Sequence, residues 1–86
     1  MREYKYDYTI SKENDPEEFK RICSLLEHRL EGYDKAPLLV DVDGSTIQIF
    51  SKGETEILVF DDYDIGAVFV KSDIDLSEII GEKKVA

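Results

Sequence analysis

The stretch PLLVDVDGSTIQIFSKGETEILVFDDYDIGAVFVK, residues 37–71, decides the fold of this chain. Apolar residues alternate with polar ones on both sides of Asp43-Gly44, and an Asp-Gly pair between two such runs favours a β-hairpin. Residues 52–54 and 61–64 are predicted as two further turns, because Gly and Asp are frequent in turns and depleted in strands. We therefore predict a meander of four strands with aspartates at its turns.

The alternation also predicts which side chains of the meander face the core. In the first hairpin, one face carries only apolar residues and is expected to be buried: Val40, Val42, Ile47 and Ile49. The other face carries Asp41, Thr46 and Gln48 and is expected to meet solvent. The next strand, residues 56–60, is continuously apolar from Ile57 onward, which predicts a central strand covered at least partly on both sides.

The segments on either side of the meander complete the set of elements. Alternating tyrosines over residues 3–10 indicate a first strand. Asp15-Pro16, followed by apolar residues at helical spacing, predicts an amphipathic helix over residues 15–31 with Asp15 as its N-cap. Near the C-terminus, Asp73 or Asp75 is expected to cap a short helix that ends at Gly81.

These elements predict an α+β fold. It consists of one mostly antiparallel, four- to five-stranded sheet in the order β-α-β-β-β-β, with a short C-terminal helix and the long helix packed on one face. Residues 1–82 are expected to form a single small domain, followed by a flexible tail at residues 83–86. A chain of 86 residues buries only roughly 60% of its unfolded surface, so we expect no deep enclosed active site.

Cysteine usage and hydropathy predict the compartment. The single cysteine, Cys23, precludes an internal disulfide, and a secreted domain of this size usually needs such bridges. No apolar run approaches the ~18 residues of a membrane span, and the start MREYKYDY lacks the apolar core of a signal peptide. We therefore expect a cytoplasmic protein that does not bind membranes.

The charge of the chain is strongly asymmetric. Its net charge is −9, and residues 36–82 hold eleven acidic residues against two basic ones, Lys52 and Lys71. Proteins that bind nucleic acids directly present a basic surface, so this distribution disfavours direct nucleic-acid binding. It favours a partner that carries positive charge.

The segment LLVDVDGS, residues 38–45, resembles the first motif of the haloacid dehalogenase-like phosphatases, an apolar strand that ends in Asp-x-Asp-Gly-Ser/Thr. The resemblance implies a nucleophile at Asp41, a general acid/base at Asp43, and Mg²⁺ held by both. That family places the motif strand in a parallel sheet, which needs a crossover of about a dozen residues or more. Because another strand follows Ser45 directly, we interpret the segment as a hairpin and treat a metal-dependent enzyme as the less favoured alternative.

The turn aspartates also invite a comparison with calcium-binding loops. An EF-hand loop that began at Asp41 would have Thr46 and Lys52 where glycine and glutamate are required, and a loop from Asp61 would end at Ser72. We therefore predict no metal and no cofactor. A divalent-cation site built from the clustered turn aspartates is left open as an alternative.

The acidic residues are most informative as a group. An acidic patch with an aromatic anchor suits docking on a basic protein surface. We predict that the partner-binding residues are the turn aspartates and one tyrosine: Asp41, Asp43, Asp61, Asp62, Tyr63, Asp64, Asp73 and Asp75.

The expected function is that of a small acidic inhibitor that binds a basic protein partner, such as a nuclease, and does not catalyse a reaction. Immunity proteins, antitoxins and phage-type counter-defence proteins act in this way. One alternative is a regulatory or oligomerising module, in which an edge strand pairs with a second chain. Another is that the acidity serves only solubility.

Overall fold

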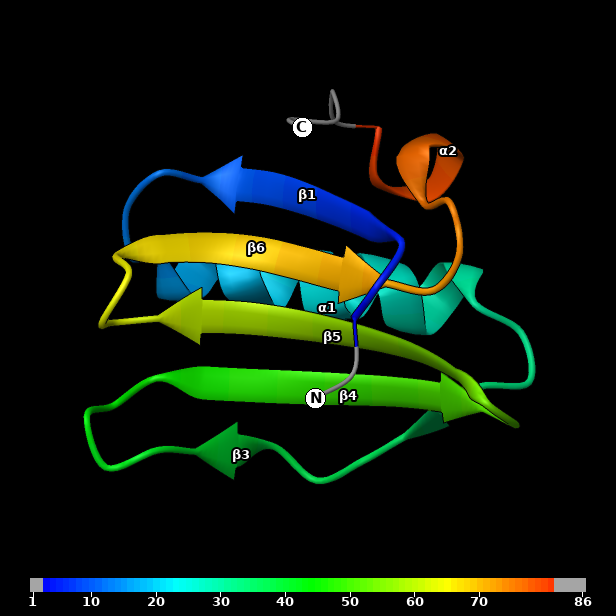
Figure 1. The fold of residues 1–86 in the computed structure, drawn as a ribbon, viewed down its shortest axis with the longest axis horizontal. Coiled ribbons are helices and arrows are strands. Elements are labelled where there is room, and N and C mark those ends of the chain that lie inside the picture. Colours follow the sequence, from blue (N-terminus) through cyan, green and yellow to red (C-terminus); the bar gives the residue numbers. More distant parts are fainter. Residues whose placement is uncertain (1–2, 82–86) are drawn as a thin grey trace.

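One antiparallel sheet with a long helix across its back makes up the fold (Figure 1). The structure is a computed structural model, and it describes residues 3–81. The elements follow the chain as β1 (Tyr6–Ser11), α1 (Pro16–Arg29), β2 (Asp34–Lys35), β3 (Leu39–Val40), β4 (Thr46–Lys52), β5 (Thr55–Asp62), β6 (Ala67–Ser72) and α2 (Ser77–Ile80). The predicted α+β fold with a mostly antiparallel sheet is confirmed.

The strand order explains how the two halves of the chain are joined. The sheet runs β1-β6-β5-β4-β2, and β3 also pairs with β4, so the N-terminal strand lies beside the last one. Strand β5 lies at the centre, as its continuous apolar run predicts. Helix α1 connects the β1 edge to the β2 edge behind the sheet, so that neither described helix covers the front face, which we call the open face, although residues 3–5 before β1 pass in front of part of it (Figure 1).

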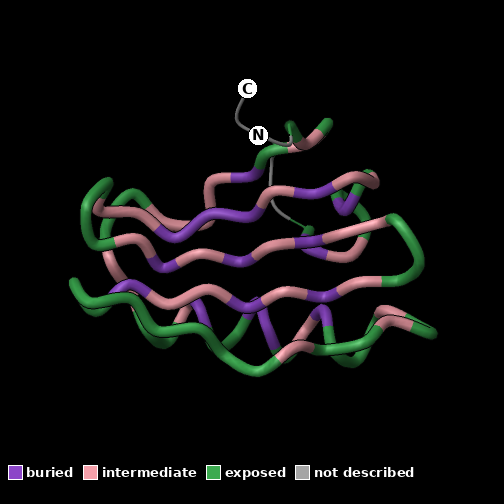
Figure 2. Tube along the Cα trace, turned by 60° about the horizontal axis from the view of Figure 1, so that its bottom comes forward, coloured by how far each residue is buried: buried purple, intermediate pink, exposed green. Residues whose placement is uncertain are grey.

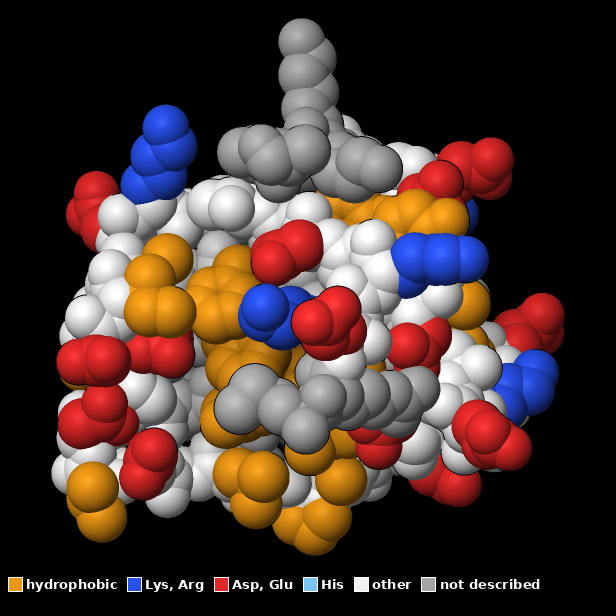
Figure 3. Space-filling model, in the orientation of Figure 1, with side chains coloured by type: hydrophobic (Ala, Val, Ile, Leu, Met, Phe, Trp, Pro, Cys, Tyr) orange, Lys and Arg blue, Asp and Glu red, His pale blue; other side chains and the backbone are white. Residues whose placement is uncertain are grey.

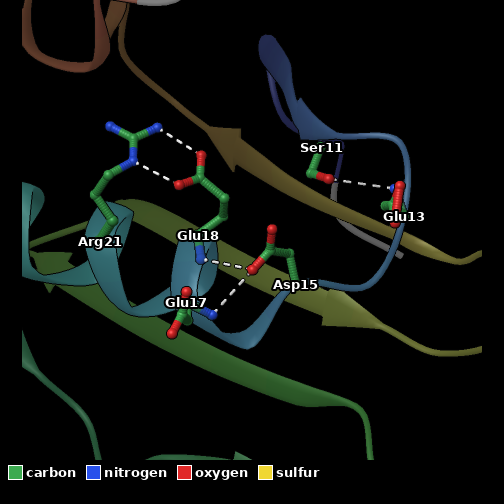
Figure 4. Close-up of polar contacts among 6 residues, drawn as sticks. All are labelled: Ser11, Glu13, Asp15, Glu17, Glu18 and Arg21. Carbon is green, nitrogen blue, oxygen red and sulfur yellow. Dashed lines mark hydrogen bonds and ion pairs between the residues drawn. The ribbon is translucent and has the colours of Figure 1, made fainter.

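Helix α1 begins where its sequence signals predict. The Asp15 carboxylate accepts hydrogen bonds from the backbone N–H groups of Glu17 and Glu18 at 3.1 and 3.2 Å, with Pro16 at the first position (Figure 4). Arg21 forms an ion pair with Glu18 one turn later on the exposed side. The apolar side of the helix is buried through Phe19, Ile22, Cys23 and Leu26.

The core lies between α1 and the back of the sheet. The sheet contributes side chains from alternate positions, so that buried and half-buried residues alternate along β5 (Figure 2), whereas in β6 Phe69 is buried as well as its neighbours Val68 and Val70. The fully buried members include Tyr8, Ile57, Val59, Val68 and Val70. Leu76 and Ile80 of the α2 region close the core at one end.

The predicted buried face of the first hairpin is wrong. Gln48, expected at the surface, is buried on the helix side of β4, whereas Ile47 and Ile49 are half-buried on the open face. Val40 and Val42 are exposed on the hairpin itself.

The physical reason is the residue that follows. Phe50 shares a face with Gln48 and aligns with Ile57 of the central strand, so burial of this large ring sets the orientation of the whole strand. The Gln48 amide donates a hydrogen bond to the carbonyl of Ala36, which offsets the cost of burying it.

Three strands also differ from the prediction: β5 in its end, β3 in its length, and β2 in being present at all. Asp61 and Asp62, expected in a turn, are the last residues of β5, because Asp61 pairs with both Thr46 and Val68. Strand β3 has two residues, and the two-residue strand β2 was not predicted.

The short helix α2 differs at its start. Its N-cap is Leu76, without a side-chain cap, in place of Asp73 or Asp75. Its end at Gly81, in the left-handed conformation, is as predicted. The predicted tail, residues 83–86, lies outside the described residues. Within residues 3–81, neither helix combines the length and apolarity that crossing a membrane requires.

Candidate functional site

Two turns of the sheet meet at one end and are tied to each other. The register of β4 on β5, with Thr46 opposite Asp61, places the β3–β4 turn beside the β5–β6 turn. The backbone N–H of Tyr63 donates a hydrogen bond of 2.8 Å to the hydroxyl of Ser45. Gly44, at φ +93°, lies under the Tyr63 ring, and a Cβ at this position would be 3.7 Å from it. The two turns therefore form one continuous surface.

The loop between β1 and α1 is the third segment at this end. The Asn14 side-chain amide donates to the Asp61 carboxylate at 3.0 Å and to the backbone carbonyl of Asp62 at 2.8 Å. Asp61 is only 2% exposed; its carboxylate fastens the loop to β5 and lies below the outer surface, at the wall of a pocket. We call the surface formed by residues 13–17, 38–46 and 61–66 the acidic end.

Two other aspartates of the acidic end, of which Asp41 is exposed and Asp62 half-buried, hold the turns in shape. Asp41 accepts a hydrogen bond from the N–H of Val42, and Asp62 accepts from the N–H groups of Asp64 and Ile65 at 2.9 and 3.0 Å. These are local side-chain-to-backbone bonds of the kind that define turns.

Asp43 makes a similar bond with a consequence for its charge. Its carboxylate accepts from the backbone N–H of Ser45 at 2.9 Å. This bond, with a second from the Ser45 hydroxyl, lowers the pKa of Asp43 below its ordinary value. The carboxylate is therefore negatively charged throughout the neutral range.

Two of the predicted site residues lie at the other end of the sheet. Asp73 and Asp75 follow β6 and are separated from the acidic end by the length of that strand (Figure 1). The Asp73 carboxylate accepts from the backbone N–H of Glu56 at 2.8 Å. Asp75 accepts from the hydroxyl of the buried Tyr8 at 3.0 Å and from the N–H of Ser77. Both residues fasten the C-terminal segment to the sheet.

The exposed apolar side chains gather at the acidic end as well. Among the described residues, six large hydrophobic side chains are exposed, and all belong to the two turns or the strand ends beside them: Leu38, Leu39, Val40, Val42, Tyr63 and Ile65. Their exposed fractions run from 48% for Tyr63 to 103% for Val42. Large contiguous patches of exposed apolar residues on small proteins are typical of interaction sites.

The open face of the sheet continues this apolar surface. One cross-strand row brings together Leu39, which is exposed, Ile47 and Phe60, which are half-buried, and Phe69, which is buried. The rings of Phe60 and Phe69 are stacked with centroids 4.6 Å apart. Figure 3 shows hydrophobic side chains over the middle of this face and acidic side chains along the side where the two turns lie.

The sequence prediction missed part of this site. The acidic residues Glu13, Asp15 and Glu17 belong to the acidic end, because the Asn14 contacts hold the start of α1 against β5. A short β1–α1 connection is a signal that the helix starts at the end of the sheet where β1 finishes. Which turns share that end depends on strand order, which the sequence leaves open.

The remaining chemical groups do not converge on a reaction centre. Among residues 3–81, no three His, Cys, Asp or Glu side chains are placed to hold a metal ion. Asp41 and Asp43 lie in an antiparallel hairpin, where the resemblance to phosphatases implies a parallel sheet. Burial raises the pKa of the Cys23 thiol to about 11, which suppresses the reactive thiolate. His28 is exposed on α1, with Nδ1 2.8 Å from the carbonyl of Ser24.

Comparison with known proteins gives no relative: no protein-family model, curated protein or solved structure matches this chain.

Proposed function

We propose that this chain is a small acidic inhibitor, of the kind represented by immunity proteins, antitoxins and phage-type counter-defence proteins. In this proposal it acts in the cytoplasm by binding, without catalysis, and docks the acidic end on the basic surface of a protein partner such as a nuclease. One observation carries the proposal: the exposed apolar side chains and the turn carboxylates occupy the same end of the sheet.

The mixture of side chains supports protein binding over solubility as the role of the acidity. Acidic residues that only keep a protein soluble need no apolar neighbours, and exposed apolar groups beside them work against solubility. A protein interface, by contrast, combines apolar anchors with a charged rim, and the charges raise the association rate with an oppositely charged partner. Tyr63, about half exposed between Asp62 and Asp64, is the aromatic anchor.

The hydrogen bonds within the acidic end support tight binding. The turns are fixed to each other through Ser45 and to the start of α1 through Asn14. Binding by a surface that is already ordered loses less conformational entropy than binding by flexible loops. The acidic end therefore meets a partner in the shape it already has.

Affinity capture from an extract of the producing cells tests the proposal. The immobilised chain is expected to retain a basic protein at low ionic strength and to release it progressively as salt rises, because salt screens the charges. The captured protein should bind the purified chain in solution and, if it is an enzyme, lose activity on binding. Failure to retain a basic protein, or retention that does not respond to salt, would contradict the proposal.

Self-association is the alternative that a specific observation favours. Among the described strands, β1 pairs with β6 alone, so its other edge makes no strand pairing within residues 3–81, and a strand from a second copy would pair there. The apolar row on the open face adds surface that a second copy would cover. Sedimentation velocity separates the two: a stable homodimer favours self-association, and a monomer at all concentrations contradicts it.

A further inference from the structure

A pocket of about 270 Å³ opens within the acidic end, between the start of α1 and the two turns. Its wall includes Phe19 and Asp61, which are both buried, together with Leu38, Thr46 and Tyr63. Three other hollows of the described surface are lined by exposed or half-buried residues only. This pocket therefore reaches closer to the core than they do.

The size of the pocket indicates its occupant. Sites for whole small-molecule ligands measure roughly 300–1,000 Å³, so this one suits a smaller group such as a single side chain. Its walls are mostly apolar, from the ring of Phe19, the Leu38 side chain and the Tyr63 ring. An occupant with an apolar stem would be buried favourably against them.

Several side chains have an apolar stem, and the charge of the pocket indicates which of them fits best. Asp61 is nearly buried, and its one described hydrogen-bond donor is the neutral amide of Asn14. Among residues 3–81, no lysine or arginine forms an ion pair with it. A buried carboxylate without a counter-charge favours an incoming cation. The exposed Tyr63 ring favours a planar cation, because a guanidinium group stacks on aromatic faces.

We infer that this pocket takes an arginine side chain of the partner protein, with its methylene stem against the apolar walls and its guanidinium group at Asp61 and Tyr63. The inference rests on the proposed function for the source of the arginine. Lys20 is the one cationic residue among the side chains that line the pocket, and it is exposed at the start of α1. Its charge opposes the incoming guanidinium group, so its removal should strengthen binding.

The test follows backbone amide shifts of the ¹⁵N-labelled chain while n-butylguanidinium, a mimic of the arginine side chain, is added. The neutral isostere N-butylurea and the non-planar cation n-butylammonium are the comparison ligands. Asp61→Asn removes the charge but keeps an oxygen that accepts from Asn14. Asp64→Asn is its matched control, because it removes an equal charge from the exposed surface of the same end. Lys20→Gln tests the predicted gain.

The expected result is saturable shifts confined to the pocket, centred on Gly44, Thr46 and Tyr63. Binding of N-butylurea, and binding of n-butylguanidinium to Asp61→Asn, should be at least fivefold weaker. Asp64→Asn should change the affinity less than twofold, and Lys20→Gln should raise it about twofold.

Several outcomes would overturn the inference. These are shifts spread over all exposed carboxylates, equal binding of the urea, or an unchanged affinity of Asp61→Asn. Equal binding of n-butylammonium would overturn the choice of arginine. If Asp61→Asn does not fold, the inference is tested by the comparison of the three ligands on the wild type and by the affinity of Lys20→Gln for n-butylguanidinium. If the pocket binds n-butylguanidinium but cell extracts yield no basic partner, only the proposed function is contradicted. If extracts yield a basic partner but the pocket does not bind n-butylguanidinium, only the arginine pocket is contradicted.

Discussion

The hydroxyl of Ser45 accepts a hydrogen bond of 2.8 Å from the backbone N–H of Tyr63, and this bond joins two turns that are 18 residues apart in sequence. Ser45 is 7% exposed, so water cannot readily replace the hydroxyl. The shape of the acidic end therefore depends on a side chain that carries no charge itself.

Replacing this serine should loosen the acidic end. Ser45→Ala leaves the N–H of Tyr63 without its acceptor, and we expect the free energy of unfolding to fall by about 1–2 kcal/mol. Urea denaturation measures the change. Ser51→Ala, half-buried in the strand β4 that follows this turn, is the control and should cost less than about 0.5 kcal/mol. Equal losses for the two variants would show that Ser45 has no special role.

Asn14 should contribute more to the free energy of unfolding than an ordinary loop residue does. Its amide makes two bonds to β5, and Asn14→Ala would leave the buried Asp61 carboxylate without that donor. We expect a loss of about 1–3 kcal/mol in the free energy of unfolding, measured by urea denaturation. Glu13→Ala, on the neighbouring exposed residue, should be nearly neutral. A neutral Asn14→Ala would refute the role assigned to this contact.

Because the Cys23 thiol is buried, we expect the free energy of unfolding to fall at alkaline pH. Burial raises the pKa of its thiol from 9.0 to about 11, so between these values the unfolded chain loses a proton that the folded chain keeps. The unfolded state then binds fewer protons, and the free energy of unfolding falls as pH rises from about 9 to 11.

The contribution of this thiol is isolated by comparing the wild type with Cys23→Ala at pH 8 and pH 10.5. Buried tyrosines such as Tyr8, whose pKa burial also raises, affect both proteins alike. Stability of the wild type should therefore fall more steeply with pH than that of the variant. Parallel pH profiles would contradict a buried, neutral thiol.

The sequence predicts much of the fold because its local signals are strong. Asp43-Gly44 predicts the hairpin, and Asp15-Pro16 predicts the start of α1, each through bonds that a few neighbouring residues make. The buried face of β4 could not be predicted in this way. Both of its faces hold large apolar residues, and the choice depends on how Phe50 packs against α1 and β5.

The candidate site was predictable only in part, for a related reason. Clustered aspartates in the turns identify an acidic surface, but strand order decides which turns are neighbours. The alternating strand direction of the meander places Asp73 and Asp75 at the opposite end. Strand order brings Asn14 to Asp61, which buries a carboxylate that the sequence presents as one turn residue among several. Long-range pairings of this kind leave no local signal.

The central claim is that the acidic end, and not the acidity of the whole chain, binds the partner. Two variants separate these possibilities, each removing four negative charges. One carries Asp41→Asn, Asp43→Asn, Asp62→Asn and Asp64→Asn; the asparagines at positions 41, 43 and 62 keep an oxygen for the turn hydrogen bonds. The other carries Glu54→Gln, Asp73→Asn, Asp75→Asn and Glu78→Gln at the opposite end.

The decisive measurement is the affinity of the captured partner for these two variants and the wild type, at low and at moderate salt. We expect the acidic-end variant to bind at least about tenfold more weakly, with a reduced salt dependence, and the opposite-end variant to stay within about threefold of the wild type. Equal weakening of the two variants, or no weakening of the first, would contradict the claim.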